Sequence, residues 1–442
     1  MPNLQHAPKA RYSPVRPPPV RSVAVIGVGY VGLPLAILAN IRGLEVRGFD
    51  IDTRKIRALT KGEAPFLSTG EARQLAEGSI TFSADETVLD GADVYVICVP
   101  TPVDEGHRPD LAPLIAASES VGRHLAKGAL VVIESTVNPG ACEDIACTAI
   151  ERLSGLVAEQ DFFFAHCPER INPGDTEWEV RTIPRVLGAV GPHSLARATA
   201  FYGAILDGPL HPMASIKEAE AVKMIENAFR DVNIAFVNEL AMSFARADID
   251  LVHVIEGAST KPFSFLPHFP GCGVGGHCIP VDPYYLIRYG RENGFHHRFL
   301  ETARAINEGM PRYTVDLAEQ ALREQGRTLS GATVALLGLA YKRDVPDLRE
   351  SPALAIRDEL LARGAHVYSF DPFAHDGSDV ESVEAALARA DVAILATDHS
   401  TLRALAPETF TQAGIRIVVD GRNCLDKEAF RSAGILYRGI GR

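Results

Sequence analysis

The sequence predicts an α/β protein with two Rossmann-like, doubly wound domains joined by a helical central domain that contains a long helix. Short β-branched apolar runs alternate with helical stretches from residue 23 to about residue 190. Residues 215–247 keep a helical apolar period without a single glycine, and the first pattern returns from residue 333. Alternating strands and helices at this spacing favour parallel sheets covered on both faces.

The first α/β domain is expected over residues 21–210. A strand over 23–26 leads into the glycine-rich turn 27–32, and the helix that follows stops at Gly43. Further apolar runs predict strands at 45–50, 93–99, 129–135, 162–166 and 185–190.

The turn between the first strand and helix carries a dinucleotide-binding fingerprint. Gly27, Gly29 and Gly32 allow a tight turn, the approach of a pyrophosphate to the backbone, and close packing of helix on strand. Asp50 ends the next strand, where a carboxylate holds the adenine ribose hydroxyls and repels a 2′-phosphate. The sequence therefore predicts NAD rather than NADP as the cofactor.

The helical central domain is expected over 211–315. Within its long helix, Lys223, Asn227 and Arg230 fall at i, i+4 and i+7 and so share one face. Taken alone, such a pattern more often indicates a solvated polar face than a site.

The same domain contains the segment 271–283, in which Cys278 lies among closely spaced glycines and before a proline-bracketed Asp282. A structural cysteine is usually a small buried hydrophobe, so a thiol in a glycine-rich loop suggests a nucleophile. A metal site is not expected, because the chain lacks C-x₂-C and H-E-x-x-H patterns here and Cys272 has the wrong spacing.

The second α/β domain is expected over 325–442. Its segment 389–400 resembles 91–102, and Asp371 ends a strand as Asp50 does. It has no full G-x-G-x-x-G, which predicts a ligand other than a dinucleotide. Lys342, Arg343 and Arg422 fall at predicted strand ends, where cations meet a pyrophosphate.

Composition excludes several classes of protein. A net charge of −12 argues against a nucleic-acid-binding surface. Seven cysteines without a compact framework favour a reduced, cytoplasmic protein, and no apolar run is long enough for a membrane span. Residues 1–20 are basic and proline-rich, lack the apolar core of a signal peptide, and are expected to form a disordered tail.

These motifs together resemble the UDP-glucose/GDP-mannose 6-dehydrogenase family over nearly all of the chain after residue 21. The matching pieces are GVGYVG (27–32), CVPTP (98–102), EST (134–136), CPER (167–170), EAVKMIENAFR (220–230), GVGGHCIPVDP (273–283), GLAYKRDVPDLRESPA (338–353) and DGR (420–422). The text around Cys278 and the segment 259–263 is similar to the branch that oxidises UDP-N-acetylhexosamines.

The resemblance implies an NAD-dependent, four-electron oxidation of the C6 alcohol of a UDP-N-acetylhexosamine to the uronic acid through a cysteine thioester, for surface polysaccharide or glycan precursors. UDP-N-acetylglucosamine is the favoured substrate. UDP-glucose, UDP-ManNAc and UDP-GalNAc stay open, as do a two-electron dehydrogenase of the hydroxy-acid type and a non-catalytic NAD-binding protein.

The resemblance also assigns roles to residues. Cys278 is the nucleophile, Lys223 stabilises the oxyanion, and Glu169 is the base for thioester hydrolysis. The catalytic set is Cys278, Lys223, Asn227, Asp282, Glu169 and Thr136. The cofactor set is Gly27, Gly29, Tyr30, Val31, Gly32, Asp50, Arg54, Thr101, Thr136 and Arg343. The substrate set is Glu169, Arg170, Lys223, Asn227, Arg230, Gly275, Lys342 and Arg422.

The long helix also predicts how the chain assembles. Its apolar stripe, which is larger than one junction between domains needs, suggests a homodimer, as the resemblance implies. The stripe consists of Val222, Ile225, Phe229, Ala235 and Phe236.

Overall fold

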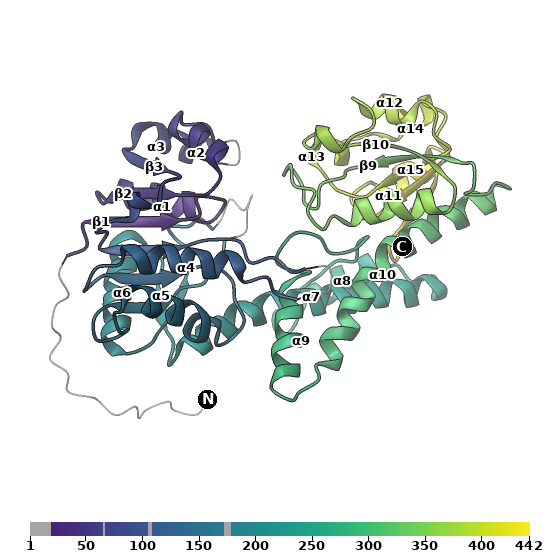
Figure 1. The fold of residues 1–442 in the computed structure, drawn as a ribbon. Coiled ribbons are helices and arrows are strands. Elements are labelled where there is room, and N and C mark those ends of the chain that lie inside the picture. The colour runs from purple at the N-terminus through teal and green to yellow at the C-terminus, as the bar shows by residue number, and fades with distance from the viewer. Residues whose placement is uncertain (1–18, 65–66, 105–107, 172–177) are drawn as a thin grey trace. The chain divides into compact units, whose positions relative to one another are not determined.

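The computed structural model describes residues 19–64, 67–104, 108–171 and 178–442 (Figure 1). The chain forms two compact units. Unit 1 comprises Met1–Pro100 and Ala112–Glu220, and unit 2 comprises Thr101–Leu111 and Ala221–Arg442. The tail expected at 1–20 lies outside the described residues except for its last two positions.

Unit 1 is built on an eight-stranded sheet in the order β3-β2-β1-β4-β5-β6-β7-β8. All neighbours are parallel except β6 and β7, which are antiparallel. The first six positions follow the order of a dinucleotide-binding sheet, which confirms the predicted doubly wound fold. The strands are β1 (Ser22–Ile26), β2 (Glu45–Phe49), β3 (Ile80–Ser83), β4 (Val94–Ile97), β5 (Leu130–Ile133), β6 (Phe163–His166), β7 (Arg185–Ala189) and β8 (Leu210–Pro212).

The central strands β1, β4 and β5 are buried along their whole length, as expected for parallel strands covered on both faces. The two outermost strands, β3 and β8, escape prediction from the sequence because they are short and only partly buried, so their apolar signal is weak. The helices of unit 1 are α1 (Gly32–Ile41), α2 (Thr53–Thr60), α3 (Thr69–Glu77), α4 (Ala112–His124), α5 (Thr148–Ser154) and α6 (Pro192–Ile205).

The predicted long helix is one continuous element, α7 (Ile216–Phe244), of 29 residues. It begins in unit 1 and continues into unit 2. Three further helices complete the helical region: α8 (Leu251–Ser259), α9 (Asp282–Glu292) and α10 (Arg298–Glu324). None of the helices in the described ranges is both long and apolar enough to cross a membrane.

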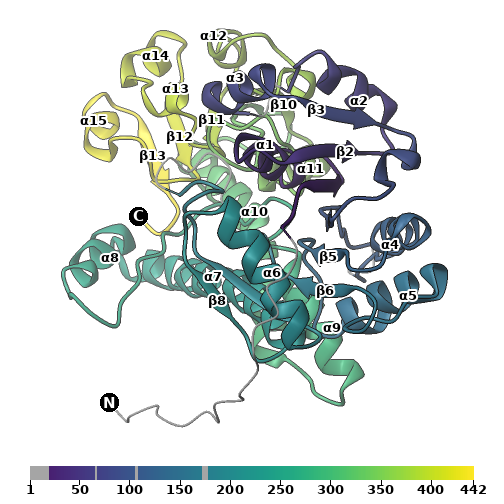
Figure 2. The same cartoon turned by 90° about the vertical axis from the view of Figure 1, so that its left-hand side faces the viewer.

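The second sheet has five parallel strands in the order β10-β9-β11-β12-β13. Figure 2 labels four of them, β10, β11, β12 and β13. Its strands are β9 (Thr333–Leu337), β10 (His366–Phe370), β11 (Val392–Leu395), β12 (Ile417–Asp420) and β13 (Leu436–Gly439). Its helices are α11 (Pro352–Ala362), α12 (Val383–Leu387), α13 (Ser400–Arg403), α14 (Pro407–Gln412) and α15 (Lys427–Ser432).

The similarity between segments 91–102 and 389–400 corresponds to a shared structural role. Asp93 accepts a hydrogen bond from the Ser22 amide at 3.0 Å, and Asp391 accepts one from the Thr333 amide at 2.8 Å. Each carboxylate therefore ties the start of the first strand of its domain to the strand beside it.

Candidate active site

The glycine turn of unit 1 has the geometry that a dinucleotide pyrophosphate requires. A Cβ on Gly27, whose φ is +89°, would lie 2.7 Å from the Cys98 carbonyl oxygen, and one on Gly32 would lie 2.1 Å from the Gly27 carbonyl oxygen. Around Gly29, by contrast, no heavy atom of the described residues lies within 4 Å of such a Cβ. Two glycines thus serve packing, and the middle one leaves the backbone open to a ligand.

Asp50 directly follows β2, beside this turn, and is 7% exposed. Its carboxylate accepts hydrogen bonds from the Val28 amide at 3.2 Å and from the Asp52 amide at 3.0 Å. Lys55 of α2 donates to it at 2.6 Å, a partner that the sequence analysis did not identify. The carboxylate is therefore held at the glycine turn, where a ribose hydroxyl is expected.

Other predicted cofactor residues of unit 1 lie in this turn or in the helix after β2. Tyr30 is 40% exposed, Val31 precedes the first residue of α1, and the side chain of Arg54 is 86% exposed at the start of α2. Thr101 belongs to unit 2, where its carbonyl oxygen accepts the Tyr285 hydroxyl at 2.7 Å.

The proposed base Glu169 follows β6 and is 8% exposed. Behind it lies Arg185, a fully buried guanidinium, with one nitrogen 3.9 Å from the Glu169 carboxylate. Arg185 also donates to the Pro168 carbonyl at 3.4 Å and to Glu134 at 3.5 Å. Burial raises the pKa of Glu134, while the charge of Arg185 and a 2.6 Å hydrogen bond from the Tyr202 hydroxyl oppose that rise.

Arg185, Glu134 and Tyr202 thus form a buried polar cluster, which anchors the segment that carries Glu169. The sequence analysis missed Arg185 because a lone arginine at the start of an apolar strand carries no motif. Thr136 follows β5 and is partly buried. Arg170 donates to the Pro184 carbonyl at 2.8 Å, so its guanidinium is tied to the segment that leads into β7.

A further buried carboxylate of unit 1 was also missed. Glu220, near the start of α7, accepts the amides of Gly140 at 2.5 Å and Cys142 at 2.8 Å. It therefore anchors the turn that follows Thr136, and it explains why an acid stands at the beginning of the motif 220–230.

In unit 2 the structure brings together four residues of the predicted catalytic set. The Cys278 carbonyl accepts the Asp282 amide at 2.8 Å and so starts the first turn of α9. Asn227 of α7 donates to the Asp282 carboxylate at 2.5 Å. Burial raises the pKa of Asp282 to about 6, and the Asn227 hydrogen bond and the positive charge of Lys223 oppose the rise. Lys223 itself is 8% exposed.

The glycines before Cys278 are required by the packing of the protein itself. A Cβ on Gly275 would lie 2.7 Å from Cβ of Tyr341, and one on Gly276 would lie 2.7 Å from the Tyr341 ring. A Cβ on Gly273 would lie 3.0 Å from Pro352. The space that glycine leaves on this side is filled by Tyr341 and Pro352, so it does not open a path to the sulfur.

The start of the cysteine loop is held by a buried polar chain between α7 and α10. Asn238 accepts the Gly271 amide at 3.0 Å and donates to Asn307 at 2.9 Å. Asn307 donates to Asp231 at 2.8 Å, and Arg304 donates to the same carboxylate at 2.7 Å. The helix that carries Lys223 and Asn227 is thereby connected to the loop that carries Cys278.

The cationic side chains that are predicted to bind a ligand differ in their surroundings. The Arg343 side chain donates to the Asp398 carboxylate at 3.0 Å. Arg422 donates to the Ala396 carbonyl at 2.9 Å, and its guanidinium would lie 3.0 Å from a Cβ on Gly271. Lys342 is partly buried beside Arg343, and Arg230 is exposed on α7.

Across the described residues no group of three or more His, Cys, Asp or Glu side chains is arranged to hold a metal ion.

The chain matches three family models of the UDP-glucose/GDP-mannose dehydrogenase family. They are the NAD-binding domain over residues 21–206, the central domain over 217–309 and the UDP-binding domain over 335–427.

Similarity to individual proteins extends over almost the full length. The chain is 39% identical over 416 residues to a UDP-N-acetyl-D-glucosamine 6-dehydrogenase of Pseudomonas aeruginosa, covering 92% of this chain and 97% of that protein. It is 36% identical over 425 residues to a UDP-N-acetyl-D-mannosamine dehydrogenase of Pyrococcus horikoshii, covering 95% and 99%. A solved structure of a UDP-D-ManNAc dehydrogenase from Pyrococcus horikoshii has a TM-score of 0.90 at 36% identity, covering 95% of this chain and 99% of that one.

The chain belongs to the UDP-glucose/GDP-mannose dehydrogenase family. It is an NAD-dependent nucleotide-sugar dehydrogenase with an NAD-binding domain and a UDP-binding domain. The predicted family, enzyme class and cofactor are thus confirmed. Within it, the NAD turn, Asp50 and Glu169 belong to unit 1, whereas Lys223 and Cys278 belong to unit 2.

Proposed function

We propose that this dehydrogenase oxidises the C6 alcohol of a UDP-N-acetylhexosamine, and UDP-N-acetylglucosamine in particular, to the uronic acid. The reaction consumes two NAD⁺ and one water and passes through a thioester on Cys278. The observation that carries the proposal is the joining of Asp282 to Asn227 and to the Cys278 carbonyl, with the charge of Lys223 acting on Asp282.

The choice of an N-acetylhexosamine rests on the two near-full-length relatives described above, which are named for UDP-N-acetylglucosamine and UDP-N-acetylmannosamine. It also rests on the Gly-His-Cys-Ile-Pro-Val-Asp text around Cys278 and on the segment 259–263. At 39% and 36% identity the relatives favour neither sugar, so the preference for the gluco configuration comes from the segment 259–263.

NAD⁺, when bound, accepts the hydride lost from C6 in each of the two oxidations. The chain's own residues supply the rest of the chemistry. Cys278, four residues before the first residue of α9, adds as a thiolate to the aldehyde carbon. The ammonium group of Lys223 stabilises the oxygen that becomes negative in this addition.

Asp282 and Asn227 orient the groups around that centre. Asp282, ionised above pH 6, attracts the Lys223 ammonium and keeps Asn227 in one orientation through their hydrogen bond. Water then cleaves the carbon–sulfur bond, which releases the uronic acid and regenerates the thiol. We propose that Glu169 takes the proton from this water and that Thr136 helps to orient it.

Binding roles follow the same reasoning. We propose that Arg170, Arg230 and the backbone at Gly275 contribute to the sugar and that Lys342 and Arg422 contribute to the UDP half. Tyr30, Val31, Arg54, Thr101 and Arg343 are proposed to serve the cofactor.

We also propose that the enzyme is a homodimer formed through α7. Ile225, Phe229 and Phe236 are 61%, 51% and 55% exposed, which is unusual for large apolar side chains on one helix. Phe229 and Phe236 line a groove of about 450 Å³ together with Phe265 and Leu266. A light-scattering mass close to 47.7 kDa at micromolar concentration would contradict this assembly.

The reaction is tested by measuring initial rates of NADH formation with UDP-GlcNAc, UDP-ManNAc, UDP-GalNAc and UDP-glucose, and the NADH formed per sugar. We expect two NADH per sugar and the highest kcat/KM with UDP-GlcNAc. One NADH per sugar would support a two-electron dehydrogenase, and a clear preference for UDP-glucose would contradict the N-acetyl assignment.

The nucleophile is tested with Cys278→Ser, for which we expect loss of uronic acid production. Cys272→Ser in the same loop is the matched control, because a serine hydroxyl can still donate to the Ala396 carbonyl as the Cys272 thiol does. Normal acid production by Cys278→Ser would contradict the role of the thiol.

A further inference from the structure

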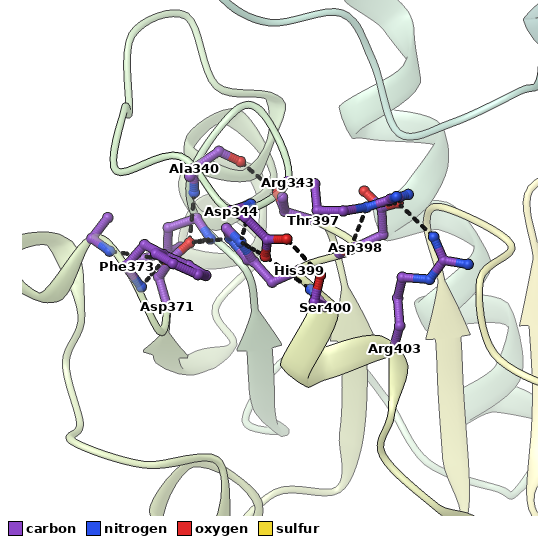
Figure 3. A network of polar contacts seen from close by, with 12 residues as sticks. Ala340, Arg343, Asp344, Asp371, Phe373, Thr397, Asp398, His399, Ser400 and Arg403 are labelled. Carbon is purple, nitrogen blue, oxygen red and sulfur yellow. Dashed lines mark hydrogen bonds and ion pairs between the residues drawn. The ribbon is translucent and has the colours of Figure 1, made fainter. Parts of the chain in front are cut away.

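The loop 338–344, which follows β9, is held in place by side chains from the neighbouring strand ends (Figure 3). The Asp371 carboxylate accepts the amides of Leu339 at 2.6 Å and Ala340 at 2.7 Å. The Thr397 hydroxyl donates to the Ala340 carbonyl at 2.5 Å. These three bonds fix the first half of the loop, and both anchoring side chains are buried.

His399 fixes the second half of the loop, and its two ring nitrogens have different roles. Nδ1 lies 2.9 Å from the Asp344 backbone nitrogen, and since a backbone amide can only donate, Nδ1 must accept. The neutral ring then carries its hydrogen on Nε2, which donates to Asp371 at 2.9 Å. The Phe373 ring stacks on the imidazole with centroids 5.1 Å apart, and His399 is fully buried.

Asp344 needs this support because its backbone is in the left-handed region, with a φ of +56°. A non-glycine residue adopts that conformation only when its surroundings hold it there. The Ser400 amide and hydroxyl donate to the Asp344 carboxylate at 2.9 Å and 2.5 Å, in addition to the bond that its own amide gives to His399.

The acids that follow the second strand of each α/β domain, Asp50 and Asp371, make different hydrogen bonds. Asp50 accepts one amide from the glycine turn, that of Val28, whereas Asp371 accepts two amides from its loop and a hydrogen bond from His399. In the alignment of segments 91–102 and 389–400, His399 takes the place of Thr101. In a dinucleotide site the acid at this position binds a ribose hydroxyl. In the second domain it binds the protein's own backbone amides and His399 instead.

The loop carries Lys342, which is proposed to bind the UDP half of the substrate. Lys342 lies between two residues with fixed contacts. Tyr341 packs against Gly275 and Gly276 of the cysteine loop. The Arg343 side chain donates to the carbonyl and to the carboxylate of Asp398, the residue before His399. We propose that His399 is a positioning residue for UDP-sugar binding, which sets the loop 338–344 and with it Lys342 without itself contacting the ligand. This inference rests on the proposed role of Lys342 in the UDP site.

The test uses the full-length enzyme and measures UDP binding by calorimetry, together with the KM values for the UDP-sugar and for NAD. For His399→Leu we expect the Kd for UDP and the KM for the UDP-sugar to rise about tenfold to a hundredfold, the change that loss of a buried hydrogen bond to a charged group produces. The KM for NAD should rise less than the Kd for UDP, because the variant leaves the glycine turn and Asp50 of unit 1 intact and affects only Arg343 among the loop residues proposed to serve the cofactor.

Asp391→Asn is the matched control. Asp391 supports the opposite end of the same sheet through the Thr333 amide and an ion pair with Arg327, so the loss of its charge should lower the melting temperature without changing UDP binding. His399→Gln keeps a donor for Asp371 and should recover part of the UDP affinity that His399→Leu loses. Thr397→Val, which removes a hydroxyl at nearly constant shape, should weaken UDP binding in the same direction.

The outcomes separate this inference from the proposed function. Unchanged UDP affinity in both His399→Leu and Thr397→Val, while the wild-type enzyme binds UDP and turns over, would overturn the positioning role. Equal loss of UDP affinity in Asp391→Asn would also overturn it, because the effect would then be general to the domain. Wild-type enzyme that binds no UDP would instead contradict the UDP assignment itself.

Discussion

Replacing Asp282 by asparagine should stabilise the folded enzyme at neutral pH and at the same time impair it. Burial raises the pKa of Asp282 from its ordinary value of 3.8 to about 6. A rise of about two pKa units corresponds to on the order of 3 kcal/mol, which is the free energy that the ionised carboxylate costs the folded state above pH 6. Asparagine removes the charge but keeps an oxygen that can accept from Asn227.

The sign of the pH dependence follows from the direction of this shift. Because the folded state binds the proton more tightly than the unfolded state, the contribution of Asp282 to stability is greatest at low pH. It is lost as the pH rises from about 4 to about 6. The Asp282→Asn variant should therefore match the wild type near pH 4 and exceed its unfolding free energy increasingly up to pH 6, with a constant difference above.

The assay is thermal or denaturant unfolding of both proteins between pH 4 and pH 8. Glu256→Gln, an exposed carboxylate on α8, serves as the control and should show no such pH-dependent difference. A variant that is less stable than the wild type at pH 7.5, or a difference that does not shrink toward pH 4, would refute the reasoning.

Catalysis should change in the opposite direction. The asparagine oxygen can still accept from Asn227, but the variant loses the negative charge that attracts Lys223, so we expect kcat to fall about a hundredfold or more. In the wild type, kcat/KM should fall below about pH 6 as Asp282 takes up its proton. Full activity of the variant would contradict the proposed role of the charge.

Three further changes test the other polar contacts. Arg185→Met should lower the unfolding free energy by about 3–5 kcal/mol because it leaves Glu134 buried without its cation, and adding Glu134→Gln should recover part of the loss in thermal denaturation. Asn238→Leu should cost about 1–3 kcal/mol by leaving the Gly271 amide unpaired, and should lower kcat with the Kd for NADH unchanged. Asp50→Asn should raise the KM for NAD and narrow the preference for NAD over NADP, as initial rates with both cofactors would show.

The fold class, the NAD-binding domain with its glycine turn, and the family could all be predicted from the sequence. These features are local: a glycine turn after an apolar run requires a particular backbone, and burial on both faces requires continuous apolar strands. The order of motifs along the chain, through the resemblance that it carries, also predicted Lys223, Asn227, Cys278 and Asp282 as site residues. The short outer strands β3 and β8 were missed, because an edge strand that is only partly buried has little apolar pattern.

The polar partners were decided by the tertiary structure. Asn238 meets Asn307 across 69 residues of sequence, and His399 meets Asp371 across 28, so no local pattern could pair them. The same holds for Gly275, a predicted substrate residue, where the packing of Tyr341 requires a glycine. Local periodicity reports which side chains are buried, but the partner of a buried polar group depends on which elements face each other after folding.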